Sequence, residues 1–143
     1  MTVIAWDGKM LASDKQVTIN GLVRTATKIR RIDHLLVGVS GNVCAAAEAF
    51  AWVERGRNPN DYPKLQESED DHANVLVIEY GRVLMYSRSP HPWEYEDVFF
   101  AIGSGRELAL AAMHCGKNAK EAVEVASLFE ASCGKGVDVL LPT

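Results

Sequence analysis

The sequence predicts an α+β fold in which helices form layers over mostly antiparallel sheets. Hairpin turn signals join short β-prone segments at Asp7-Gly8, Asn20-Gly21 and Gly81-Arg82. Segments with helical periodicity are grouped between blocks of strands and do not alternate with single strands, which argues against βαβ units. The length of 143 residues fits one domain, and no internal repeat divides the chain, so residues 1–143 are expected to form a single domain.

The first half of the chain predicts strands followed by one helix. The expected strands are Thr2–Trp6, Met10–Ser13, Gln16–Ile19, Leu22–Ile32 and Leu35–Val39. Asn42 is expected to cap a helix over about residues 42–56, because apolar residues recur there near a period of 3.6. Residues 57–71 are polar, contain two prolines and predict a surface loop.

The second half predicts three strands, two helices and a closing strand. The strands are expected at Asn74–Tyr80, Val83–Ser87 and Val98–Ile102, and the segment VDVLL closes the chain near residue 140. Gly103-Ser104-Gly105 opens a helix in which Ser104 and Glu107 are predicted to form a capping box. Asn118 with Glu121 opens the next helix.

Composition excludes several classes of function. The net charge of −4 gives no basic surplus for nucleic acid or an anionic membrane. No leader-like segment and no apolar run near 18 residues occurs, which favours a cytoplasmic protein. The three cysteines and four histidines form no metal-binding or disulfide pattern. The sequence GSGREL lacks the third glycine of a dinucleotide loop, so no cofactor is expected.

Thr2 is a candidate nucleophile. Initiator methionine is generally removed before a small residue, and removal of Met1 would leave Thr2 with a free α-amine. Such an amine titrates near ~7.7–8.0 and can accept the proton of the threonine hydroxyl without a histidine. A threonine at position 2 is not specific by itself.

Asp14 and Lys28 strengthen this hypothesis. Strand alternation places Ala26, Lys28 and Arg30 on one face. If Lys28 points inward it requires a carboxylate partner, for which Asp14 is the candidate, because a lone buried charge costs several kcal/mol. A cation near the Thr2 hydroxyl would favour its ionised form. The alternative is that Lys28 is a surface lysine in a basic strand.

The opening TVIAWDGKMLASDKQVT resembles the start of a mature proteasome β-subunit, and more closely that of the HslV-type peptidase. Further segments resemble the same family in order along nearly the whole chain. They are TKIRRI, GVSGNVCAAAEAF, FAIGSGRELALAAM and SCGKGVDVL. The resemblance implies an N-terminal nucleophile hydrolase with a four-layer αββα sandwich, in which two mostly antiparallel sheets lie between helical layers.

The resemblance also implies roles for residues at matching positions. Thr2 would cleave peptide bonds beside an Asp14–Lys28 ion pair, the Gly41 amide would serve the oxyanion hole, and Ser104 would assist proton transfer. Val39 would line the specificity pocket and favour apolar side chains. The family's D-x-x-S-G arrangement is here EASCG, so Glu130 and Cys133 stand where the family has Asp and Ser.

The leading hypothesis is a threonine endopeptidase that acts on peptide or unfolded-protein substrates. The resemblance implies a homo-oligomeric ring and a possible ATPase partner. Two alternatives are a non-catalytic ring-forming subunit and an amidase that acts on small substrates outside a ring. A cysteine hydrolase that uses Cys44, Cys115 or Cys133 is a further alternative, but no histidine stands in an interpretable relation to any of them.

Overall fold

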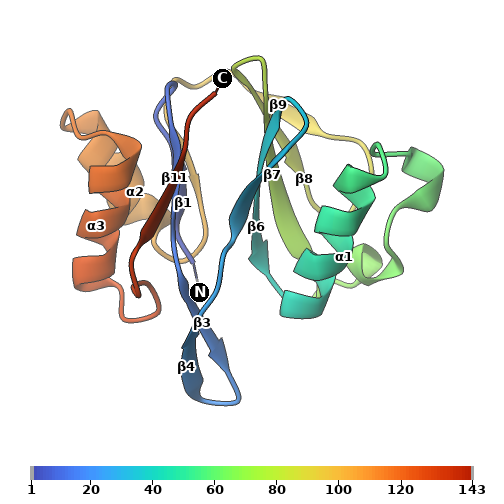
Figure 1. Cartoon of the computed structure of the whole chain (residues 1–143), viewed down its shortest axis with the longest axis horizontal. Helices are drawn as coiled ribbons and strands as arrows, with labels where there is room; N and C mark the ends of the chain where they lie inside the picture. The colour runs from blue at the N-terminus through green and yellow to red at the C-terminus, as the bar shows by residue number, and fades with distance from the viewer. Residues whose placement is uncertain (1, 143) are drawn as a thin grey trace.

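Two antiparallel sheets lie face to face at the centre of the molecule, with helices on both outer sides (Figure 1). The computed structural model describes residues 2–142. The layers follow the order helix pair, four-stranded sheet, five-stranded sheet, single helix. This arrangement confirms the predicted α+β class and the αββα sandwich.

The four-stranded sheet combines the two ends of the chain. Its strand order is β10-β1-β2-β11, and each neighbouring pair is antiparallel. The strands are β1 (Ile4–Trp6), β2 (Leu11–Asp14), β10 (Phe100–Ile102) and β11 (Val137–Leu140). Strand β1, which follows the N-terminal residues, therefore lies between β10 and β2.

The five-stranded sheet follows the chain order β5-β6-β7-β8-β9, again with antiparallel pairs. Its strands are β5 (Ile29–Ile32), β6 (Leu35–Gly41), β7 (Ala73–Glu79), β8 (Arg82–Tyr86) and β9 (Trp93–Tyr95). The turn between β7 and β8 is Tyr80-Gly81, one residue earlier than the sequence indicates. Both residues have positive φ, +49° and +79°, as a tight hairpin turn requires.

The predicted strand Leu22–Ile32 is wrong as a single element. Strand β4 (Leu22–Thr25) pairs only with β3 (Gln16–Ile19), in a hairpin that projects from the sandwich (Figure 1). Strand β5 begins four residues later and pairs with β6. Residues 26–28 connect the two, so one continuous alternation in the sequence serves two different sheets.

Three α-helices cover the sheets. Helix α1 (Val43–Glu54) packs on β6 and β7, while α2 (Arg106–His114) and α3 (Ala119–Phe129) pack on the four-stranded sheet. The predicted caps of α1 and α3 are present: the Asn42 side chain accepts from the Ala45 amide, and Asn118 forms a capping box with Glu121. The loop before β7 contains two short 3₁₀ helices, Pro59–Asp61 and Lys64–Glu67.

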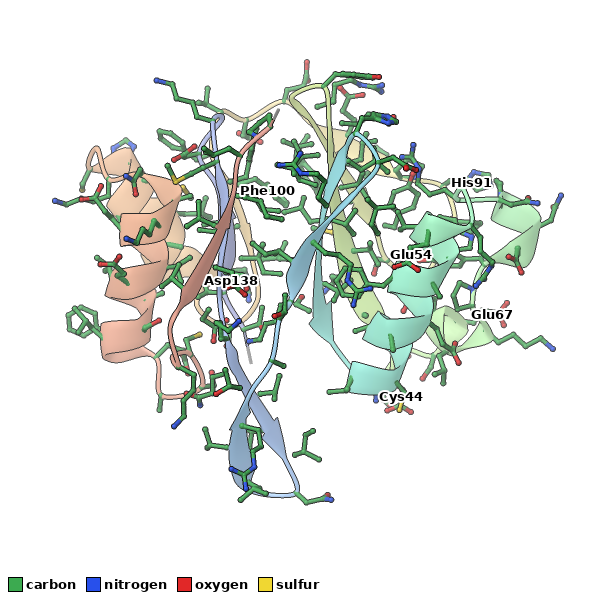
Figure 2. All side chains as sticks on the ribbon, viewed as in Figure 1. Cys44, Glu54, Glu67, His91, Phe100 and Asp138 are labelled. Carbon is green, nitrogen blue, oxygen red and sulfur yellow. The ribbon has the colours of Figure 1, made fainter. Side chains whose placement is uncertain are left out.

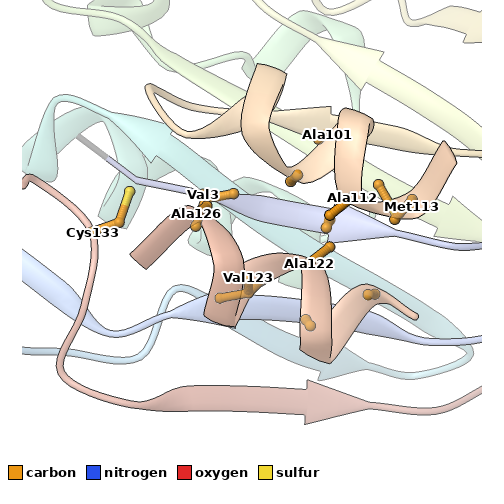
Figure 3. Packing of buried hydrophobic residues seen from close by; sticks show 12 residues of the cluster. Val3, Ala101, Ala112, Met113, Ala122, Val123, Ala126 and Cys133 are labelled. Atoms are coloured by element: carbon orange, nitrogen blue, oxygen red, sulfur yellow. The ribbon is translucent and has the colours of Figure 1, made fainter. Parts of the chain in front are cut away.

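Small residues allow α2 and α3 to lie close to the four-stranded sheet. The buried cluster on that side includes Val3, Ala112, Ala126 and Cys133 (Figure 3). A second cluster lies under α1, and a third, built around Trp6 and Leu76, fills the space between the sheets. Among residues 2–142, no helix is long and apolar enough to cross a membrane.

Candidate active site

Thr2 is held at the start of β1 by the loop before α2. The Thr2 backbone nitrogen donates to Ser104 Oγ at 3.1 Å, and the Gly105 amide donates to the Thr2 carbonyl at 3.1 Å. A Cβ on Gly103, where φ is +95°, would lie 2.1 Å from the Thr2 carbonyl oxygen. The glycine at this position is therefore what allows the loop to approach residue 2 so closely.

Ser104 does not form the predicted capping box. Gly105 is the N-cap of α2, and no side chain makes a cap hydrogen bond there. The Ser104 hydroxyl instead lies beside the Thr2 nitrogen, because the helix begins only at Arg106. The S-x-x-E spacing therefore marks the helix start without supplying its cap.

The predicted Asp14–Lys28 ion pair is present and buried. Lys28 Nζ lies 2.8 Å from Asp14 Oδ1, with side-chain exposures of 6% and 0%. Asp14 also accepts hydrogen bonds from three backbone amides, those of Val3, Gln16 and Gly134, at 3.1–3.3 Å. These four donors compensate the desolvation of the buried Asp14 carboxylate. Because Asp14 binds both Lys28 Nζ and the Val3 amide, it holds the lysine next to the residue that follows Thr2.

Thr2, Lys28 and Gly41 line one cavity of about 210 Å³. The other lining residues come from the β3 strand, the β4–β5 connection, β5, β6 and α1. They are Val17, Thr18, Ala26, Thr27, Arg30, Val39, Ser40, Val43, Ala46, Ala47 and Phe50. The predicted common face of Ala26, Lys28 and Arg30 thus opens into the same space as Thr2, and Val39 lines it as well.

Gly41 has a φ of +118°, and a Cβ there would lie 2.7 Å from the His72 carbonyl oxygen. Glycine is required at this position both by the backbone conformation and by the adjacent strand β7. The result is a main-chain segment without a side chain that lines the same cavity as Thr2.

A chain of hydroxyl groups joins Glu130 to Thr2. Ser132 Oγ donates to Glu130 Oε1 at 2.8 Å and lies 2.9 Å from Ser104 Oγ. Because Ser132 donates its one proton to Glu130, it can only accept from Ser104, and Ser104 in turn accepts from the Thr2 nitrogen. The Thr2 carbonyl oxygen, at 3.4 Å, is a longer alternative acceptor for the Ser104 hydroxyl. The Ser132 hydroxyl holds the pKa of Glu130 below its usual value, so the chain ends on a carboxylate.

Cys133 is buried next to this chain, with Sγ 4.0 Å from Ser104 Oγ. Burial raises the pKa of the Cys133 thiol, and the nearby Asp14 charge raises it further. A neutral thiol is a poor nucleophile, which argues against cysteine chemistry here. Cys44 and Cys115 are exposed, free and outside the residues that line the cavity (Figure 2 labels Cys44).

The site assembles most of the predicted residues but also contains some that the sequence did not single out. Ser132, Arg30 and Phe50 are the main additions. Ser132 lies within the EASCG segment, and its hydroxyl was the available signal beside Glu130 and Cys133. Among the residues described, no group of three or more potential metal ligands is close enough to hold an ion.

Comparison with known proteins identifies the family. No family model matches the chain. It is 32% identical to the ATP-dependent protease subunit HslV of Geobacillus kaustophilus over 120 residues, which cover 71% of this chain and 67% of that protein. It is also 32% identical to HslV of Enterococcus faecalis over 134 residues, 78% and 72% of the two chains.

The chain belongs to the HslV family. It is therefore a threonine-type N-terminal nucleophile protease of the proteasome/HslV class. Solved structures agree on the fold of this HslV-family chain. Eukaryotic HslV from Trypanosoma brucei superimposes with a TM-score of 0.71 at 24% identity and 97% coverage of both chains. Thiobacillus denitrificans BPH in complex with epoxomicin superimposes with a TM-score of 0.72 at 21% identity over the whole of both chains.

Proposed function

We propose that residues 1–143 act as one domain that hydrolyses peptide bonds with Thr2 as nucleophile, after removal of Met1. Met1 itself lies outside the described residues. The observation that carries the proposal is the shared cavity, in which Thr2, Lys28 and Gly41 face the same space. A peptide lying in this cavity would place its carbonyl carbon next to the Thr2 hydroxyl.

The first step forms an ester with the substrate. The Thr2 hydroxyl oxygen bonds to the carbonyl carbon while its proton passes to the Thr2 α-amine, and the Gly41 amide donates to the oxygen that becomes negative. The scissile C–N bond then breaks, and the leaving amine takes the proton from the α-ammonium. Water next attacks the ester with the α-amine again as base, which releases the acid and restores Thr2.

Lys28 and Asp14 prepare the nucleophile. The ammonium of Lys28 favours the negatively charged form of a hydroxyl that faces the same cavity. Asp14 keeps this ammonium in place, and through the Val3 amide it also positions the residue next to Thr2. Asp14 is therefore a positioning residue, and Lys28 supplies the electrostatic effect.

The hydroxyl chain supports the α-amine as base. When the amine takes a proton, Ser104 accepts a hydrogen bond from the resulting ammonium, and Ser132 and Glu130 orient Ser104 for this role. Glu130 thereby takes part through Ser132 and not by direct contact. Cys133 acts as a neutral neighbour of Ser104 in this arrangement.

We also propose that the chain forms a cytoplasmic homo-oligomeric ring that degrades unfolded protein with an ATPase partner. The relatives are named ATP-dependent protease subunits, which favours such a partner. Large apolar side chains are exposed at several places on the described residues, and two of these places are the β3–β4 hairpin and the end of α3. The exposed side chains at these two places are Ile19, Leu22, Val23, Leu128 and Phe129. Exposed apolar clusters of this kind favour contacts between subunits.

Intact mass and cleavage of short fluorogenic peptides test the mechanism. Purified untagged protein is expected to lack the mass of one methionine and to cleave peptides. Thr2→Ala is expected to abolish cleavage while light scattering shows unchanged assembly, and Thr2→Ser should retain part of the activity. Unchanged turnover in Thr2→Ala would reject the mechanism. Retained methionine without cleavage would favour a non-catalytic ring subunit, and activity of a monomer on small amides alone would favour the amidase.

A further inference from the structure

The cavity beside Thr2 extends away from it along β5 and α1. Arg30 lies two residues beyond Lys28, about 7 Å along the strand. Phe50 lies seven residues beyond Val43, about 10 Å along α1. Arg30 and Phe50 therefore line the part of the cavity that lies further along β5 and α1 than Lys28 and Val43, and we expect the tip of a bound side chain to lie there.

Arg30 is fixed over Phe50 by a residue outside the cavity. Its guanidinium carbon lies 3.9 Å from the centroid of the Phe50 ring, and its Nη1 lies 3.0 Å from Glu54 Oε1. Glu54, which Figure 2 labels on α1, follows Phe50 by four residues in the sequence. Both groups that hold Arg30 therefore come from one face of this helix. Glu54 is not among the residues that line the cavity.

Both cations of the cavity are therefore matched by carboxylates that lie behind them. Lys28 pairs with Asp14 near Thr2, and Arg30 pairs with Glu54 further along β5. The rest of the lining is mostly apolar, formed by side chains such as Val39, Val43 and the alanines of α1, with hydroxyl groups from Thr18, Thr27 and Ser40. The volume of about 210 Å³ exceeds that of a ~150 Å³ cavity that binds benzene, so a large apolar side chain fits.

We propose that Glu54 is the specificity-determining residue that excludes acidic side chains from this cavity, by neutralising Arg30 and holding it on Phe50. This inference rests on the proposed function, because it assumes that the cavity receives the side chain on the acyl side of the cleaved bond. Glu54 never touches the substrate in this account. It acts through Arg30, whose charge would otherwise attract a carboxylate to this part of the cavity.

The test compares peptides that differ only in the residue before the cleaved bond, leucine or glutamate. The wild-type protein is expected to prefer leucine in kcat/KM. Glu54→Gln should raise the glutamate-to-leucine ratio about two- to fivefold, because a half-exposed Arg30 is then free to pair with the substrate carboxylate. The double variant Glu54→Gln with Arg30→Met should lose this gain, because the cation itself is then absent.

Asp61→Asn is the matched control. Asp61 pairs at 2.8 Å with Arg55, the residue that caps the C-terminus of α1, both side chains are half-exposed, and neither residue lines the cavity. This variant should leave the glutamate-to-leucine ratio unchanged. A ratio that is unchanged in Glu54→Gln, or that rises equally in Asp61→Asn, would overturn the proposal.

Binding separates this inference from the catalytic proposal. Acetylated peptides that end in leucine or glutamate can be titrated into the Thr2→Ala form, with the same substitutions at Glu54 and Asp61, and followed by calorimetry. A shift towards glutamate only in the Glu54→Gln background supports the inference even if no peptide is cleaved. Equal affinities in all backgrounds would overturn it even if cleavage by Thr2 is confirmed.

Discussion

Replacing Asp14 by asparagine should cost more stability than replacing Lys28 by methionine. The Asp14 carboxylate accepts four hydrogen bonds, two at each oxygen, from Lys28 and from the amides of Val3, Gln16 and Gly134. Asparagine has one acceptor oxygen, so two of the four donors would face its NH₂ group. Each unsatisfied buried donor costs about 1–3 kcal/mol, and breaking a buried ion pair costs about 3–5 kcal/mol.

The low ends of these ranges give a loss of about 5 kcal/mol for Asp14→Asn, which is as large as the whole stability of a marginal domain. Lys28→Met leaves the carboxylate with three amide donors, so its loss should stay near the low end, about 3 kcal/mol. We therefore expect Lys28→Met to fold but to lose cleavage, and Asp14→Asn to be largely unfolded.

Urea denaturation at one fixed protein concentration measures both losses, because association also contributes to stability. The conservative variant Lys28→Arg serves as a control for the ion pair, since it keeps the charge near Asp14. Equal losses in Asp14→Asn and Lys28→Met, or a larger loss in Lys28→Met, would show that the amide donors do not determine the energetics of this carboxylate.

Three further changes test the surroundings of Thr2. Gly103→Ala places a methyl group 2.1 Å from the Thr2 carbonyl oxygen and should abolish cleavage. Its control is Gly21→Ala, which is also at positive φ but has open space around it. This control should cost only about 1–2 kcal/mol of stability and leave cleavage intact. Ser132→Ala interrupts the hydroxyl chain and should lower kcat about 10- to 100-fold with little change in KM. Ser132→Thr keeps a hydroxyl group and should retain most of the wild-type kcat. An unchanged kcat in Ser132→Ala would show that the hydroxyl chain takes no part in the mechanism. Because Cys133 is buried and its pKa is raised, its thiol should be alkylated more slowly at pH 7–8 than the two exposed cysteines. Cys133→Ala should still cleave peptides. Loss of cleavage when Cys133 alone is alkylated would support a cysteine hydrolase instead.

Local chemistry made several elements predictable from the sequence. The side chains of Asn42 and Asn118 each accept a hydrogen bond from the amide three residues later. Four consecutive residues are therefore enough to predict each cap. The Asn20-Gly21 turn has positive φ at both residues, which the dipeptide itself favours. Strand alternation likewise grouped Ala26, Lys28 and Arg30, which all line the cavity, but it did not decide whether Lys28 points inward.

Long-range contacts explain what the sequence could not predict. The β-prone segment from Leu22 to Ile32 is continuous in the sequence. In the fold its first part pairs in the β3–β4 hairpin and its last part pairs in the five-stranded sheet. Only these tertiary pairings decide where the first strand ends. Ser104 fits a capping box by spacing, yet its hydroxyl is used by Thr2 and Ser132, which are 102 and 28 residues away. A pattern confined to one turn of helix carries no information about such partners.

The arrangement around Asp14 links the site to closure of the fold. One carboxylate is bound by Val3 at the start of the chain, by Lys28 at the entry to the second sheet and by Gly134 near the end. Strand β11 begins three residues after Gly134 and pairs with β2, the strand that carries Asp14. The position of Thr2 therefore depends on the last strand being in register, because a shift of β11 would withdraw the Gly134 amide and leave Asp14 with fewer donors. A nucleophile that is supported from both ends of the chain is assembled only when folding is complete.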